Sequence, residues 1–134
     1  MNWIRMGLTV FAGGLVASLT DWLFMGDWLY KRFNRNPEIW RHADGKGEMT
    51  AIAWSAPLPF VTSAVFAFLC VRLNLHSFGA TLKLALAIWL CGPLPLLITH
   101  GLFIKLHPAI TASYSAGWLV KLAVAAVAVA FFLG

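Results

Sequence analysis

Residues 108–132 read PAITASYSAGWLVKLAVAAVAVAFF, a long apolar stretch with a single charged residue, Lys121. Pro108 is well placed for the first turn of a helix. A helix needs about 20 predominantly apolar residues to cross the hydrocarbon core of a bilayer. The stretch from residue 109 to residue 132 is therefore predicted to be a transmembrane helix, and the rest of the chain is interpreted from it.

Three more stretches have the same character and are predicted to span the membrane at about residues 6–30, 50–71 and 84–104. Charged residues flank the spans and are scarce within them, as expected of transmembrane segments. Polar stripes at helical period, which a water-soluble bundle would show, are not visible. The first apolar stretch runs to about Tyr30, too long for the core of a signal peptide, so we expect an uncleaved first span.

The composition agrees with this interpretation. Apolar residues make up 60% of the 134 residues and charged residues only 11%, against about 25% charged in an ordinary soluble domain. The length leaves room for one domain, residues 1–134. The predicted fold is all-α: an integral membrane bundle of four transmembrane helices, with the lipid bilayer as its first partner.

The net charge of +5 does not form a basic face, so no nucleic-acid partner is expected. Lysine and arginine instead predict the orientation, because cytoplasmic loops carry an excess of both. Six of them lie in the first and third loops: Lys31, Arg32, Arg35, Arg41, Lys46 and Lys105. Three lie at the other end of the spans: Arg5, Arg72 and Lys83. This distribution places the first and third loops in the cytoplasm and both termini outside it.

The first loop is longer than a bundle needs. Its segment 36–41, NPEIWR, has an Asn-Pro helix start followed by an acidic residue. We expect a short interfacial helix at about Pro37 to His42, anchored in the bilayer by Trp40. The alternative is an irregular loop.

Three ionisable residues lie well inside predicted spans: Asp21, His100 and Lys121. Such residues are costly in a membrane and are functional candidates by default. All three fall near the midplane or on its cytoplasmic side. Four further residues are predicted in the same layer: Tyr114 and Trp118, which share the helix face of Lys121, and Trp54 and Ser55 from the second span.

Asp21 and Lys121 are predicted to form an ion pair, because each makes the other tolerable in a low dielectric. His100 is expected to join them through a hydrogen bond. Three interpretations stay open: a ligand pocket or proton-binding site facing the cytoplasm, a buried clasp that fixes helix packing, and unpaired side chains that extend to the interface.

Two proline pairs lie near mid-depth, Pro57 and Pro59 in the second span and Pro93 and Pro95 in the third. Each proline removes a backbone hydrogen bond and tends to kink its helix. Two kinks at one depth would widen the bundle into a pocket, or would be accommodated by packing.

Small residues on the first span form one face, at Gly13, Gly14, Ala17 and Ser18, and the last span is rich in alanine. Such faces let a neighbouring helix approach closely. One face of the last span is expected to meet another subunit, in a homo-oligomer or in a larger membrane complex.

Motifs for catalysis or metal binding are missing from the sequence. It has no nucleophile elbow, glycine-rich phosphate loop or HExxH motif, so no catalytic residue is assigned. His100 and His107 are seven residues apart, but the end of the third span and Pro108 break the helix that would place both on one face. Cys70 and Cys91 lie in unrelated apolar stretches. No metal and no cofactor are expected.

The opening Met1-Asn2-Trp3-Ile4, the aromatic segment from Trp22 to Trp28 and the four-span plan resemble a known group. The chain is similar to the small bacterial membrane proteins grouped as domain of unknown function 1761, although its first loop is longer and more charged. The resemblance implies a four-helix bacterial inner-membrane protein with no assigned activity, in which the orientation given by lysine and arginine makes the termini periplasmic. It transfers no site residues.

The predicted function is non-enzymatic: the bundle binds a lipid-like or small hydrophobic ligand, or serves as an accessory membrane subunit. A small oligomeric transporter or channel is the first alternative. A membrane enzyme that uses the Asp21, His100 and Lys121 layer for acid–base chemistry is the second.

Overall fold

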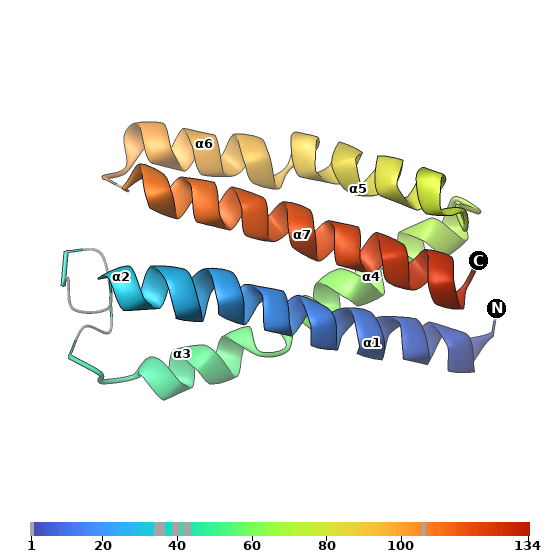
Figure 1. The fold of residues 1–134 in the computed structure, drawn as a ribbon, viewed down its shortest axis with the longest axis horizontal. Coiled ribbons are helices and arrows are strands. Elements are labelled where there is room, and N and C mark those ends of the chain that lie inside the picture. The colour runs from blue at the N-terminus through green and yellow to red at the C-terminus, as the bar shows by residue number, and fades with distance from the viewer. Residues whose placement is uncertain (1, 34–36, 39–40, 42–43, 106) are drawn as a thin grey trace.

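The computed structural model describes residues 2–33, 37–38, 41, 44–105 and 107–134, and these form helices, turns and short connections. In chain order the helices are α1 (Trp3–Asp21), the π-helix η1 (Trp22–Tyr30), α2 (Lys31–Phe33), α3 (Glu48–Ser55), α4 (Leu58–Arg72), α5 (Phe78–Cys91), α6 (Pro93–Phe103) and α7 (Pro108–Phe132). They form an elongated bundle with both chain ends at one end (Figure 1).

Within the described part of the chain, four helical stretches are long and apolar enough to cross a membrane, as predicted: Trp3–Phe33, Glu48–Arg72, Phe78–Phe103 and Pro108–Phe132. The third begins six residues earlier than expected, at Phe78 instead of residue 84. The hydroxyl oxygen of Ser77 accepts a hydrogen bond from the Ala80 N–H at 3.3 Å and caps this helix. Lys83, which had marked the boundary, instead lies exposed within the helix.

Side-chain caps also fix the first and last helices. Asn2 Oδ1 accepts hydrogen bonds from the N–H groups of Ile4 and Arg5, at 3.0 and 3.2 Å. His107 Nδ1 accepts from the Ala109 N–H at 3.0 Å, and Pro108 occupies the first helical position, where its missing N–H costs nothing.

Both proline pairs interrupt their helices. The second span is divided between Ser55 and Leu58, with Pro57 at the break, and the third is divided at Gly92, after which Pro93 starts α6. Because Pro59 has no N–H, the Ser55 carbonyl loses the donor that an unbroken helix would give it. The break leaves α3 on the outside of the bundle, with none of its residues buried (Figure 1).

The central helix of the bundle is α7, which packs against α1, α4, α5, α6 and η1. The small face predicted on the first span is used within the chain. A Cβ atom at Gly13 would lie 2.9 Å from Ser63 Oγ and 3.5 Å from the Ala128 Cβ, and one at Gly14 would overlap the Phe60 ring. This face therefore brings α1 against α4 and α7, and it is not free for another subunit.

Two clusters of buried apolar residues lie toward opposite ends of α7. The larger joins α4, α5 and α7 around Phe66, Leu122 and Val129. The smaller joins η1, α2 and α7 through Leu29, Phe33 and Ile110. The stretch of α7 between them, residues 113–121, carries the polar residues of interest, and Ser113, Ser115 and Lys121 are buried within it.

Half of the interfacial helix predicted at residues 37–42, Trp40 included, lies outside the described part of the chain. The described members Pro37, Glu38 and Arg41 lie in turns.

Candidate functional site

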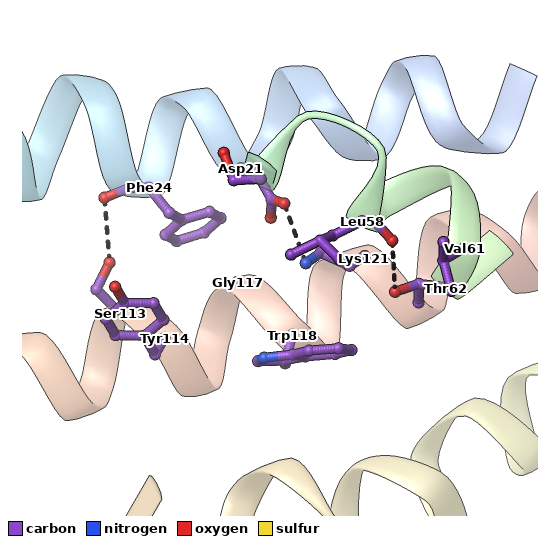
Figure 2. A pocket seen from close by; sticks show the side chains of 11 residues that line it. Asp21, Phe24, Leu58, Val61, Thr62, Ser113, Tyr114, Gly117, Trp118 and Lys121 are labelled. Carbon is purple, nitrogen blue, oxygen red and sulfur yellow. Dashed lines mark hydrogen bonds and ion pairs between the residues drawn. The ribbon is translucent and has the colours of Figure 1, made fainter. Parts of the chain in front are cut away.

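The ion pair predicted between Asp21 and Lys121 is present. Lys121 Nζ lies 3.0 Å from Asp21 Oδ2, and the two side chains are 10% and 30% exposed. Asp21 is the last residue of α1, whereas Lys121 lies at the middle of α7. Figure 2 shows the two side chains directed at each other across the space between these helices.

The Trp118 side chain completes the surroundings of the ammonium group. Lys121 Nζ lies 4.3 Å from the centroid of the Trp118 ring, the geometry of a cation–π interaction. Trp118 precedes Lys121 by three residues, so both side chains project from one face of α7. The ammonium group is thus held between a carboxylate and an indole ring.

A cavity of about 420 Å³ opens beside the ion pair, and we call it the central cavity. Its walls are mostly apolar, and Asp21 and Lys121 supply its charges. Helices α1 and η1 contribute Asp21 and Phe24, and α7 contributes Ser113, Tyr114, Gly117, Trp118 and Lys121. The broken second span contributes Ser55, Leu58, Val61 and Thr62 (Figure 2).

The π-helix η1 shapes one wall of the central cavity. Long π-helical segments are rare, and single-turn π-bulges are frequently found at functional sites. Here the Phe24 carbonyl of η1 accepts a hydrogen bond from the Ser113 hydroxyl of α7 at 3.3 Å. A Cβ atom at Gly117 would lie 3.6 Å from the Phe24 ring, an ordinary van der Waals distance, so the ring packs beside α7 at this position.

Several lining residues were not predicted: Phe24, Leu58, Val61, Thr62, Ser113 and Gly117. Helical spacing could have identified two of them, because Ser113, Gly117 and Lys121 are four residues apart and share a face of α7. The wall from α4 could not be found this way, since it depends on where the second span breaks.

Two predicted members do not line the central cavity. His100 lies on α6, which packs against α5 and α7, and α7 lies between α6 and the first helix of the chain (Figure 1). Trp54 is 78% exposed and borders a shallow surface hollow with Met49, Thr50 and Ala53. Consecutive helical residues differ in direction by about 100°, so Ser55 faces the central cavity and Trp54 does not. Tyr114, Ser55 and Trp118 lie where the layer was predicted.

Asp27, which was expected near the end of the first span, pairs with Lys31 at 2.6 Å, with both side chains well exposed. Among the described residues, no group of three or more histidine, cysteine, aspartate or glutamate side chains is placed to hold a metal ion. Cys70 and Cys91 are free thiols. The central cavity therefore offers one charged pair, aromatic rings and hydroxyl groups as its chemistry.

No protein-family model, curated protein or solved structure matches this chain.

Proposed function

We propose that the chain is a multi-pass protein of the bacterial inner membrane that binds a small, lipid-like ligand in the central cavity. The observation that carries this proposal is a charged pair beside a mostly apolar cavity of about 420 Å³ between helices. Small-molecule sites typically have about 300–1,000 Å³, apolar walls and a few placed polar groups. A buried clasp alone would be closely packed around the pair.

The exterior of the bundle supports the membrane assignment. Large apolar side chains are exposed along the outer faces, for example Phe11 and Leu19 on α1 and Leu86 and Leu90 on α5. A water-soluble monomer rarely exposes apolar surface on this scale. The resemblance to domain of unknown function 1761 agrees with a bacterial inner-membrane location.

A binding role fits the central cavity better than catalysis does. The acid–base alternative required His100 beside Asp21 and Lys121, and His100 does not line the cavity. The ligand is expected to enter sideways from the bilayer, past Leu58 and Val61, whose side chains are about half exposed. α3 leaves this side of the bundle uncovered.

The test fills the central cavity from its rim. In Thr62→Trp the indole ring would occupy the space of the ligand. Among the described residues, the bond lost is the one from the Thr62 hydroxyl to the Leu58 carbonyl of its own helix. Native mass spectrometry of the gently extracted protein should find a co-purified small molecule on the wild type and little or none on Thr62→Trp.

Val65→Trp is the matched control, because Val65 is on the same helix, is exposed, and does not line the central cavity. It should keep the bound molecule. A bare wild-type mass, or an adduct that both tryptophan variants keep, would count against a ligand in the central cavity.

The topology proposed for the chain has a separate test. In a variant without Cys70 and Cys91, a cysteine placed by Asn34→Cys should be protected in intact cells from a membrane-impermeant thiol reagent. A cysteine placed by Leu73→Cys, in the loop after α4, should react. The two loops lie at opposite ends of the second predicted span. Reaction of the cysteine at position 34 and protection of the cysteine at position 73 would therefore place the termini in the cytoplasm.

A further inference from the structure

The accessible charge of the central cavity is negative. The ammonium group of Lys121 is enclosed, with its side chain only 10% exposed, between the carboxylate of Asp21 and the ring of Trp118. Asp21 is 30% exposed and uses Oδ2 for Lys121. A carboxylate can accept about four hydrogen bonds, so Asp21 keeps the capacity to meet a second donor from the cavity side.

The hydroxyl groups that line the cavity are mostly acceptors toward a ligand. Thr62 donates its proton to the Leu58 carbonyl at 3.2 Å, Ser55 to the Ile52 carbonyl at 2.9 Å, and Ser113 to the Phe24 carbonyl at 3.3 Å. Each hydroxyl has one donor and two acceptor sites. With the donor engaged, only the lone pairs remain, and such an environment favours a ligand that donates or carries positive charge.

Aromatic rings supply the third element. Phe24, Tyr114 and Trp118 all line the central cavity (Figure 2). The faces of aromatic rings attract cations, and aromatic cages are a recurring means of binding quaternary ammonium groups. One of these rings already holds the ammonium group of Lys121, which demonstrates the preference within the chain itself.

From these three features we propose that the ligand of the central cavity is a lipophilic organic cation, an amphiphile with an ammonium head group. This inference rests on the proposed function. The head group lies against the free side of the Asp21 carboxylate and the aromatic rings, and the apolar tail passes Leu58 and Val61 toward the bilayer. Lys121 and the ligand then share one carboxylate.

The proposal predicts opposite effects for the two members of the ion pair. Lys121→Met removes the cation that competes for Asp21, so binding of a cationic amphiphile should be kept or strengthened. Asp21→Asn removes the anion, so this binding should weaken roughly tenfold or more, as expected for the loss of a charge-assisted contact. A cavity that bound an anionic head group would show the reverse.

The experiment measures binding of decyltrimethylammonium and decyl phosphate to the protein in phosphatidylcholine nanodiscs by equilibrium dialysis. Thr62→Trp provides the blank for partitioning into the bilayer. The wild type and Lys121→Met should bind the ammonium probe above this blank and should not bind the phosphate probe. Asp21→Asn should bind neither.

Two further variants cover the case that Asp21→Asn does not fold. The pair Asp21→Asn/Lys121→Met carries no charge in the cavity and should lose the ammonium probe. Trp118→Leu leaves both charges and removes one aromatic ring, and it should weaken binding of the ammonium probe several-fold. Binding of decyl phosphate that Lys121→Met abolishes would overturn the cationic assignment and leave the proposed function standing. Failure of both probes, together with no adduct in native mass spectrometry, would overturn both.

Discussion

Asp21→Asn should lower the free energy of unfolding by about 3–5 kcal/mol, because it leaves the enclosed ammonium group of Lys121 without its anion. Lys121→Met should cost less, since the Asp21 side chain that remains is more exposed and can meet water in the central cavity. The double variant should regain about half or more of the larger loss. Unfolding by dodecyl sulfate in mixed micelles, followed by circular dichroism, measures all three.

The pair Asp27–Lys31 provides the control for this cycle. Lys31 Nζ lies only 2.6 Å from Asp27 Oδ1, but both side chains are well exposed. Exposed pairs contribute about 0–1 kcal/mol, so Asp27→Asn should change the stability little. If Asp21→Asn proved as mild as Asp27→Asn, the ion pair of the central cavity would not be a buried one.

Gly13→Leu should lower the free energy of unfolding by about 3 kcal/mol, toward the upper end of the usual cost of overpacking. Its Cβ alone would lie 2.9 Å from Ser63 Oγ and 3.5 Å from the Ala128 Cβ, and the rest of the side chain would separate α1 from α4 and α7. The same unfolding measurement applies.

Gly7→Leu is the matched control on the same helix, because a Cβ at Gly7 meets no atom within 4 Å. Leucine has a higher helix propensity than glycine by up to about 1 kcal/mol, so this variant should be unchanged or slightly more stable. Equal free energies of unfolding for the two leucine variants would show that α1 does not pack through its face of small residues.

The four long helices could largely be predicted, because length and apolar composition alone identify helices that are able to cross a membrane. The helix boundaries were predicted less accurately. Lys83 indicated that the third helical stretch begins at residue 84, but this lysine lies on an exposed face within the helix, and the cap at Ser77 sets its start. The π-helix at Trp22–Tyr30 could not be foreseen, since the contact that accompanies it comes from Ser113 on α7.

The charges of the candidate site were predicted, whereas its walls were predicted only in part. The pairing of Asp21 with Lys121 could be predicted from the free-energy cost of an unpaired charge among apolar helices, because two opposite charges there stabilise each other. His100 could not be excluded the same way. Its absence from the cavity follows from the packing order around α7, with α6 on the side away from Asp21, and the sequence carries no signal of that order.

The central claim is that a small molecule occupies the central cavity beside the Asp21–Lys121 pair. A crystal structure of the protein grown from a lipidic cubic phase tests it most directly. The account predicts non-protein density between α1, α4 and α7, with a polar end against Asp21 and a tail that passes Leu58 and Val61. A cavity closed by the side chains of Phe24, Tyr114 and Trp118, with the ion pair packed between them, would contradict it.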